Sequence, residues 1–305
     1  MSFNNQLRRL ARRLPQAKRI GAVRDAWGAS QQFVAPGHFY SPIPALDHVH
    51  SDAARIFSAP ERTLAGIELN EDHQLALLHS FEPFYDELPF QASATEGLRY
   101  CYENPAYSYA DAIFLYSLIR HAQPKRIVEV GSGWSSCAIL DTNERFFDHG
   151  IETMFVEPYP QLLHSLISSA DRGRIRLLPQ RLQDVSLDEF TRLQARDILF
   201  VDSTHVSKVF SDVNVLFFDI LPRLQPGVFV HFHDIFYPFE YPKSWILQGR
   251  AWNEAYLLRA FLQFNSGYRV VLMNTFLEHF HRRYFEQRMP LCLKNPGGSI
   301  WLQRV

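Results

Sequence analysis

One stretch of the chain decides the fold: it reads RIVEVGSGWSS over residues 126–136. Residues 126–130 are mostly apolar and β-branched, which predicts a short strand, and Gly131 and Gly133 predict a tight turn that opens a helix. A strand, a Gly-x-Gly turn and a helix in this order are typical of sheets that bind nucleotides or nucleosides. Ser136 stands where a pyrophosphate-binding turn has its third glycine, and no Gly-Lys-Ser/Thr follows. The stretch therefore indicates neither a dinucleotide site nor a P-loop.

From residue 126 onward, short apolar runs alternate with helical runs. Apolar runs without polar alternation predict strands that are buried on both faces, as in a parallel sheet covered by helices. The pattern predicts an α/β domain with a doubly wound, mostly parallel, seven-stranded Rossmann-like sheet, whose last two strands form an antiparallel pair at one edge. The expected strands are 126–130, 153–156, 175–178, 198–201, 228–232, 269–272 and 299–302, and the expected helices lie near 134–147, 159–169, 206–221, 251–264 and 275–286.

The residues before this sheet domain (126–305) divide into two segments. Residues 31–125 hold a proline-containing stretch at 36–44 and two expected helices, near 70–87 and 108–122, which together predict a helical N-terminal cap. Residues 1–30 form a basic arm, since the first 24 residues carry seven basic side chains and no acidic one. Apolar residues recur in the arm at helical spacing. We expect an arm helix that is either solvated or weakly docked on a membrane surface or an acidic protein.

Composition excludes several classes of protein. The chain has 305 residues, of which 47% are hydrophobic and 21% charged, as in globular domains. Beyond residue 24, 24 basic side chains stand against 32 acidic ones, and this acidic body argues against nucleic-acid binding. No apolar run is long enough to span a bilayer, no secretory signal is present, and the three cysteines are widely spaced. We expect a cytoplasmic protein, at most peripheral to the inner face of the membrane, and a homo-oligomer is compatible with the sequence.

Polar side chains follow five successive strands at the point where each strand ends. In open α/β sheets these carboxyl ends meet at one edge, and the ligand binds there. Glu157 lies 24 residues after Gly133, a spacing suited to an acid that binds ribose hydroxyls. A ribose-binding acid without a pyrophosphate turn, on an acid-rich edge, points to a cationic nucleoside such as S-adenosylmethionine. The residues expected at this edge are Glu129, Gly131, Ser132, Gly133, Glu157, Gln183, Asp184, Asp202, Ser203, Thr204, His205, His231, His233 and Asp234.

Three motifs resemble those of the class I S-adenosylmethionine-dependent methyltransferases, in particular a bacterial O-methyltransferase-like branch. They read EVGSGWSS at 129–136, DILFVDSTHVSKV at 197–209 and LQPGVFVHFHDI at 224–235. The resemblance implies a methyltransferase fold, S-adenosylmethionine as cofactor and a set of cofactor contacts. These are Glu129, Gly131, Ser132 and Gly133 for the methionine part, Glu157 for the ribose, Gln183 or Asp184 for the adenine, and Asp202 beside the transferring methyl group.

Methyl transfer to a hydroxyl needs an acceptor close to the methyl carbon and a base that removes the hydroxyl proton. His205 is the first candidate for this base because it lies three residues after Asp202, where similar O-methyltransferases of the catechol type place a basic residue. Imidazole also titrates near neutral pH. His233 is the second candidate. The alternative for His205 is a supporting role, and His231, which lies inside a strand, is assigned a structural role.

A divalent metal is also compatible with this edge. Asp202 and Asp234 end adjacent expected strands, so their carboxylates can converge on a cation that lowers the pKa of an acceptor hydroxyl. Metal-dependent relatives have another oxygen ligand beside the second of these acids, whereas this chain has His233 and Ile235 as its neighbours. A site that includes the histidine would suit Zn²⁺, Mn²⁺ or Fe²⁺. Alternatively, Asp234 only orients a histidine.

The loop after the fifth strand is rich in aromatic side chains: residues 236–245 read FYPFEYPKSW. Such rings either stack on a sugar or ring substrate or pack as a small satellite core. The candidates for acceptor contacts are Tyr237, Tyr241, Trp245 and Arg250.

The preferred interpretation is an S-adenosylmethionine-dependent O-methyltransferase that acts on a hydroxyl of a small molecule or carbohydrate. One alternative is a metal-dependent hydroxylase or hydrolase that uses the histidines and acids of the same edge. Another is a non-catalytic partner that docks through the basic arm. A nicotinamide-dependent dehydrogenase is disfavoured because Ser136 replaces the third glycine.

Overall fold

The computed structural model describes residues 33–305 of the chain. These residues form two compact units, a larger one of residues 59–242 and 252–305 and a smaller one of residues 33–58 and 243–251. The expected basic arm, residues 1–30, lies outside the described residues. Within residues 33–305, no helix combines the length and the apolar character that a bilayer span requires.

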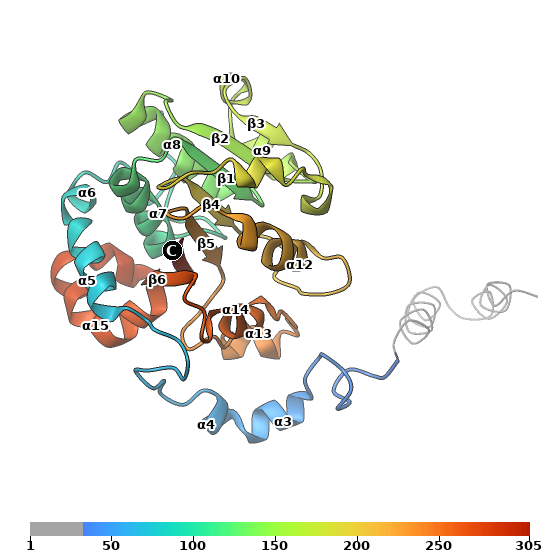
Figure 1. Ribbon diagram of the computed structural model, residues 1–305. Helices are drawn as coiled ribbons and strands as arrows, with labels where there is room; N and C mark the ends of the chain where they lie inside the picture. Colours follow the sequence, from blue (N-terminus) through green and yellow to red (C-terminus); the bar gives the residue numbers. More distant parts are fainter. Residues whose placement is uncertain (1–32) are drawn as a thin grey trace, which may run out of the picture. The chain divides into compact units, whose positions relative to one another are not determined.

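The larger unit is built on a seven-stranded sheet, of which β1 to β6 are labelled in Figure 1. The strand order is β3-β2-β1-β4-β5-β7-β6, and β7 runs antiparallel to both of its neighbours. This confirms the expected doubly wound, mostly parallel sheet with an antiparallel pair at one edge. The strands are β1 (Arg126–Val130), β2 (Glu152–Val156), β3 (Arg176–Leu178), β4 (Ile198–Val201), β5 (Phe229–His233), β6 (Tyr268–Met273) and β7 (Ser299–Arg304).

The centre of the sheet is buried on both faces. Val128, Leu199 and Val230 lie side by side in the register of β1, β4 and β5, and none is more than 2% exposed. Burying a side chain of this kind contributes about 1.5–3 kcal/mol. Burial on both faces explains why these strands lack the polar alternation of a half-exposed sheet.

The helices of the larger unit precede and connect the strands. The N-terminal helices α5 to α7 come before the sheet, as expected for a helical cap, and α5 and α15 lie beside β6 (Figure 1). The helices are α5 (Glu71–Ser80), α6 (Glu82–Asp86), α7 (Tyr109–Ala122), α8 (Trp134–Phe147), α9 (Gln161–Leu166), α10 (Ser169–Arg172), α11 (Asp188–Thr191), α12 (Asp212–Val215), α14 (Glu254–Leu262) and α15 (Asn274–Arg288). Short 3₁₀ segments at Leu182–Asp184, Leu221–Arg223 and Pro290–Lys294 and a π turn at Leu216–Ile220 complete them.

Three expected helices are shorter than their sequence pattern predicts. The helix expected at 206–221 begins only at α12, because Phe210 has a left-handed backbone (φ 53°) and the hydroxyl of Ser211 caps the amide of Asn214 at 3.2 Å. The helix expected at 159–169 divides where Ser168 caps α10. The helix expected at 70–87 divides into α5 and α6, and Pro83 stands in the first turn of α6, where it needs no helical partner for its nitrogen.

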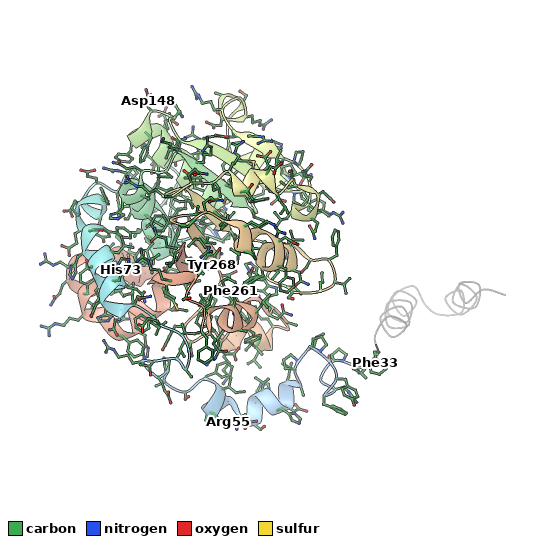
Figure 2. The ribbon with its side chains drawn as sticks, viewed as in Figure 1. Phe33, Arg55, His73, Asp148, Phe261 and Tyr268 are labelled. Carbon is green, nitrogen blue, oxygen red and sulfur yellow. The ribbon has the colours of Figure 1, made fainter. Side chains whose placement is uncertain are left out.

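Side chains from separate elements hold the far edge of the sheet. Figure 2 labels Phe261 on α14 and Tyr268 on β6, whose ring centroids lie 5.2 Å apart. The hydroxyl of Tyr268 donates to the carbonyl of Leu221 at 2.6 Å. These contacts join a helix, a strand and the 3₁₀ segment before β5, and so help to fix the edge of the sheet that carries β6.

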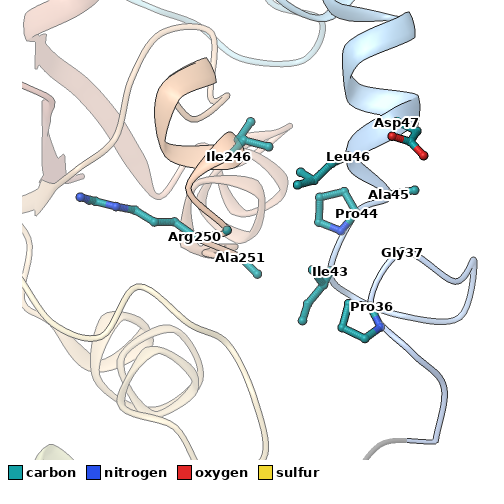
Figure 3. Close-up of a pocket in the computed structure, with 11 residues that line it drawn as sticks. Pro36, Gly37, Ile43, Pro44, Ala45, Leu46, Asp47, Ile246, Arg250 and Ala251 are labelled. Atoms are coloured by element: carbon teal, nitrogen blue, oxygen red, sulfur yellow. The ribbon is translucent and has the colours of Figure 1, made fainter. Parts of the chain in front are cut away.

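The smaller unit holds α3 (Leu46–Ser51), α4 (Ala53–Ile56) and α13 (Lys243–Leu247). It contains a cavity of about 440 Å³, shown in Figure 3. Residues 36–37 and 43–47 supply one side of the lining, and Ile246, Gly249, Arg250 and Ala251 supply the other.

Candidate active site

The glycine turn after β1 fits closely against the end of β4. Gly131 has φ +86°, and a Cβ at this position would lie 1.8 Å from the carbonyl oxygen of Asp202. The amide of Asp202 donates to the carbonyl of Val130 at 2.9 Å, and the amide of Gly131 donates to Val156 at 3.0 Å. The turn therefore joins the ends of β1, β2 and β4, and only glycine satisfies both its backbone angle and this close approach.

Glu129 lies beneath this turn and is completely buried. Its carboxylate accepts hydrogen bonds from the hydroxyls of Ser135 at 2.5 Å and Ser136 at 2.6 Å. The Ser136 oxygen also accepts from the amide of Gly133 at 3.0 Å, so the residue that replaces a third glycine caps the start of α8. Burial, only partly offset by these bonds, raises the pKa of Glu129 to about 8.

A cavity of about 380 Å³ opens beside the turn, within the size range of small-molecule sites. Glu157 lies on its wall and is held by the amides of Ser132 at 3.2 Å and Tyr159 at 2.8 Å. On the far wall, the amide nitrogen of Gln183 donates to the carbonyl of Phe210 at 2.7 Å. The lining comprises Val130, Gly131, Val156, Glu157, Pro158, Tyr159, Arg181, Leu182, Gln183, Asp202, Ser203, Thr204, Lys208, Phe210, Ser211 and Asp212.

Four of the expected cofactor residues line this cavity, namely Gly131, Glu157, Gln183 and Asp202. Asp184 does not, since its carboxylate pairs with Arg181 at 2.8 and 3.0 Å. Glu129, Ser132 and Gly133 belong to the turn or lie beneath it rather than among the lining residues. Their contacts with a cofactor therefore stay predictions.

The residues present fit a cationic nucleoside such as S-adenosylmethionine. Apolar and aromatic side chains of Tyr159, Leu182 and Phe210 can contact a base, and the Glu157 carboxylate can accept from ribose hydroxyls. The hydroxyls of Ser132 and Ser203 are buried and have no hydrogen-bond partner among residues 33–305. Because buried polar groups are normally bonded and Ser203 lines the cavity, the Ser203 hydroxyl is available to a ligand there.

A cluster of acids and histidines lies where β4 and β5 end. Nε2 of His205 lies 3.4 Å from Oδ1 of Asp202 and 3.6 Å from Oδ2 of Asp234. Nδ1 of His233 lies 3.4 Å from Oδ1 of Asp202 and 3.7 Å from Oδ1 of Asp234. His205 and Asp234 both have left-handed backbones, with φ of 58° and 57°. The four expected catalytic and metal residues thus meet at one point, and Asp202 belongs both to the cluster and to the cavity wall.

Glu254 supports His205 from the opposite side of the ring. It is completely buried, and its Oε2 lies 2.9 Å from Nδ1 of His205. The carbonyl of His205 also accepts from the amides of Asn253 at 3.1 Å and Glu254 at 3.2 Å. The start of α14 therefore holds both the main chain and the ring of His205, which leaves Nε2 facing the two aspartates. The ring of Trp252 lies 4.4 Å from the His205 ring.

The carboxylates control the charge of both histidines. Burial alone would lower the pKa of His205, but hydrogen bonds to Asp202 and Glu254 outweigh burial and raise it to about 10. For His233, attraction to Asp202 and Asp234 likewise outweighs burial and raises its pKa well above the usual value. The same pairing lowers the pKa of Asp202 against the effect of burial, whereas burial dominates at Asp234 and raises its pKa.

Three residues of the cluster fit a divalent metal ion. Ligand atoms of Asp202, His233 and Asp234 all lie within 4.8 Å of one another. Nδ1 of His233 is buried and has no hydrogen-bond partner in the part of the chain that the structure describes. One imidazole and two carboxylates form a donor set suited to Mn²⁺, Fe²⁺ or Zn²⁺.

The other expected residues lie in packed surroundings. His231 stacks on Phe200 with ring centroids 3.8 Å apart, and its Nε2 bonds the hydroxyl of Ser299 at 3.0 Å, which agrees with a structural role. The hydroxyl of Tyr237 donates to the carbonyl of Glu61, and that of Tyr241 accepts from the amide of Ala255. Tyr237 and Tyr241 are 8% and 3% exposed, so their burial favours the alternative of a satellite core.

Trp245 and Arg250 belong to the smaller unit. There the guanidinium of Arg250 lies 4.2 Å from the centroid of the Trp245 ring, and Arg250 also lines the cavity of Figure 3. Their contact with an acceptor stays a prediction.

The strand-end pattern missed two acids of the site. Glu254 begins α14, and Asp111 lies on α7, where its Oδ2 is 3.5 Å from Nε2 of His233. Both come from helices, so the rule that polar groups gather at strand ends does not find them. The only sequence signal for Asp111 is a single acid among the mostly apolar residues 109–119 of this helix.

Comparisons with known proteins found a family model, a related protein and several solved structures. Residues 128–235 match a family described as a methyltransferase domain. An uncharacterised protein of Archaeoglobus fulgidus is 34% identical over 164 residues, which cover 52% of this chain and 73% of that protein. The solved structure of the Podospora anserina methyltransferase PaMTH1, bound to SAH, has 14% identity and a TM-score of 0.42, with 90% of this chain and 99% of that chain covered. The O-methyltransferase TomG of Streptomyces achromogenes, involved in tomaymycin synthesis and solved with SAM, has 15% identity and a TM-score of 0.41, with 85% and 96% covered.

The family of the chain follows from the matched methyltransferase model together with the fold. The methyltransferase model covers residues 128–235, from within β1 to just past the end of β5. The sheet order with antiparallel β7 is that of the class I methyltransferase fold. The chain therefore belongs to the family of class I S-adenosylmethionine-dependent methyltransferases.

Proposed function

We propose that this methyltransferase transfers its methyl group to a hydroxyl of a small molecule or carbohydrate. The observation that carries the proposal is the double position of Asp202, which lines the cavity and lies 3.4 Å from a nitrogen of each histidine. A hydroxyl placed beside Asp202 would adjoin both the methyl donor and a proton acceptor. Family membership favours this reaction over the hydroxylase or hydrolase alternative.

His205 is the proposed proton acceptor. Glu254 holds its Nδ1, so a neutral His205 keeps its hydrogen on Nδ1 and presents the lone pair of Nε2 toward Asp202 and Asp234. The same relation between a carboxylate and an imidazole orients the base in other enzymes. With a pKa of about 10, however, His205 must first lose its proton, and the negative charges around it oppose that loss.

A divalent cation would resolve this conflict, and Asp202, His233 and Asp234 are the residues that would hold it. When bound, such an ion would stabilise the ionised acceptor hydroxyl and offset the carboxylate charges that keep His205 protonated. Asp202 and Asp234 would then hold the ion, and Glu254 would continue to orient His205.

The charge of the cluster bears on the class of acceptor. Asp111, Asp202, Asp234 and Glu254 place four carboxylates around two imidazoles. An anionic acceptor would be repelled, so a neutral hydroxyl compound, a sugar or a phenol, suits the site.

Cofactor binding is the first test. Titration calorimetry with S-adenosylmethionine should detect binding in EDTA and again with Mg²⁺ or Mn²⁺, because the cavity lies beside the cation site. Glu157→Ala should weaken binding at least tenfold, since it removes a charged acceptor of hydrogen bonds. An unchanged affinity in Glu157→Ala would overturn the assignment of this cavity to the cofactor.

Transfer is tested with tritium-labelled S-adenosylmethionine and a panel of polyols, hexoses and catechols. Label that survives alkali distinguishes an ether from a methyl ester and therefore supports O-methylation of a hydroxyl. His205→Gln should bind the cofactor normally and lower turnover about 100-fold or more, within the usual contribution of a general base. His79→Gln, at a largely exposed histidine, serves as the control. Full turnover of His205→Gln on the labelled acceptor would rule out His205 as the base.

A further inference from the structure

Asp111 reaches the cation site from outside the segment that matches the methyltransferase family. It lies on α7, before β1, and its side chain is only 5% exposed. Its Oδ2 lies 3.5 Å from Nε2 of His233, on the side of the ring that faces away from Asp202 and Asp234. The Asp111 carboxylate thus faces Nε2 of His233, and the proposed metal site faces Nδ1 of the same ring.

The Asp111 carboxylate is held in a socket formed by Asn274, Gly297, Gly298 and Ser299. Its Oδ1 accepts three hydrogen bonds, from Nδ2 of Asn274 at 2.9 Å, the hydroxyl of Ser299 at 2.5 Å and the amide of Gly298 at 3.2 Å. All three donors converge on Oδ1, which leaves Oδ2 to face His233. Gly297 has φ +69°, and any Cβ there would lie within 2.4 Å of both carboxylate oxygens. The socket therefore requires glycine at 297 and admits little movement of the carboxylate.

The His233 ring is fixed on its remaining sides as well. The ring of Tyr107 lies 5.1 Å away, and the Tyr107 hydroxyl donates to the main-chain carbonyl of Asp111 at 3.0 Å. Opposite Asp111, Nδ1 of His233 has no hydrogen-bond partner among residues 33–305, although it lies 3.4 Å from Asp202 and 3.7 Å from Asp234. A cation bound by the two carboxylates would give this buried nitrogen the partner that it lacks.

We propose that Asp111 is a positioning residue, which binds the Nε2 hydrogen of His233 and thereby directs the Nδ1 lone pair at a divalent cation shared with Asp202 and Asp234. This inference rests on the cation site of the proposed function. Histidines that bind metals almost always donate their other ring hydrogen to a carboxylate or carbonyl, and loss of that partner typically weakens metal binding about 10–100-fold. The helix before the sheet is therefore part of the site.

Asp111→Asn in the full-length chain is the direct test. The asparagine oxygen can keep the three donors at the Oδ1 position, which places its NH₂ group against Nε2 of His233. That contact favours the other tautomer, with the hydrogen on Nδ1, where it blocks a metal ligand. We expect Mn²⁺ affinity, measured from the electron paramagnetic resonance of free Mn²⁺, to fall at least tenfold. The visible spectrum of the Co²⁺-loaded protein should also change, because a nitrogen ligand is lost.

Asp197→Asn is the matched control. Asp197 is 2% exposed and accepts from the amides of Lys125 and Arg126, but it precedes β4, at the opposite end of the strand from Asp202. This variant should lose stability and keep its Mn²⁺ affinity. Ser299→Ala, a milder change that removes one donor to Asp111, should weaken Mn²⁺ severalfold and leave S-adenosylhomocysteine affinity in EDTA unchanged.

The outcomes separate this inference from the proposed function. If the wild-type protein binds Mn²⁺ and both Asp111→Asn and Ser299→Ala bind it equally well, Asp111 does not position the ligand, and the cation site stands. If the wild type itself binds no Mn²⁺, the cation site fails and this inference with it. If Asp197→Asn loses as much Mn²⁺ affinity as Asp111→Asn, the effect comes from general destabilisation, which also overturns the assignment.

Discussion

Replacing Gly131 by alanine should damage both the fold and cofactor binding, whereas the same change at Gly133 should be tolerated. A Cβ on Gly131 would lie 1.8 Å from the carbonyl oxygen of Asp202, and real Cβ contacts essentially never fall below 3.0 Å. The two strand ends must therefore separate by about 1 Å. The left-handed backbone at φ +86° costs a further ~1–2 kcal/mol for a residue with a Cβ.

The total for Gly131→Ala follows from these two effects. Separation of the strand ends also strains the bond from the Asp202 amide to Val130, which contributes about 1 kcal/mol. We expect a loss of about 2–4 kcal/mol in the free energy of unfolding. Because Asp202 lines the cavity, a shift of about 1 Å should also misplace its contacts with the cofactor and weaken cofactor binding by on the order of 100-fold.

Gly133→Ala is the matched control within the same turn. Gly133 has an extended backbone (φ 172°), and its Cβ would lie 3.3 Å from the end of the Leu162 side chain, which is half exposed and free to move. Alanine at this helix cap should cost about 1 kcal/mol or less. Urea denaturation and calorimetry with S-adenosylhomocysteine measure both quantities. Affinity within threefold of wild type in Gly131→Ala, or equal damage in Gly133→Ala, would refute the reasoning.

Further predictions concern stability and the cavity wall. Arg99→Met should lower the free energy of unfolding by about 3 kcal/mol in urea, because Arg99 pairs in the interior with Asp141 at 2.7 Å and also with Asp171, whereas Arg176→Met at an exposed pair should cost about 1 kcal/mol or less. Equal losses would contradict the role of burial. Against the effect of burial, hydrogen bonds from Arg99 lower the pKa of Asp171 to about 2, so this stabilisation is present above about pH 4 and is lost as the pH falls toward 2. Acid titration monitored by circular dichroism should therefore show that Arg99→Met unfolds at a higher pH than the wild type. An unchanged pH midpoint of unfolding would contradict a stabilising role for the pair of Arg99 and Asp171. Gln183→Ala should weaken S-adenosylhomocysteine binding in calorimetry, while Asp184→Ala, outside the cavity lining, should not.

Local patterns were sufficient for much of the sheet. The predicted bounds of β1, β4 and α8 agree with the structure to the residue, because continuous apolar runs and the glycine turn are signals that lie within the elements themselves. The expected helix at 206–221 failed where the backbone turns left-handed at His205 and Phe210. Neither residue is a glycine, so the sequence carries no sign of these angles.

The same distinction holds for the site. The strand-end rule placed Asp202, His233 and Asp234 at one edge, where the structure brings their ligand atoms within 4.8 Å. It did not predict that the side chain of Glu129 would lie beneath the glycine turn and accept hydrogen bonds from Ser135 and Ser136. The direction of a strand-end side chain depends on partners in the next helix, and a rule about strand ends contains no information about them.

The two missed acids show what that rule lacks. Asp111 and Glu254 each come from a helix, where an acid normally faces water, yet both are nearly or completely buried against a histidine. Burial of an acid without a partner would cost several kcal/mol, so each of these carboxylates implies a cation or a hydrogen-bond donor beside it. The relevant partners lie 122 residues from Asp111 and 49 residues from Glu254 in the chain, at His233 and His205. An apolar helix that carries a lone acid is therefore a reason to search the strand ends for the histidine that it supports.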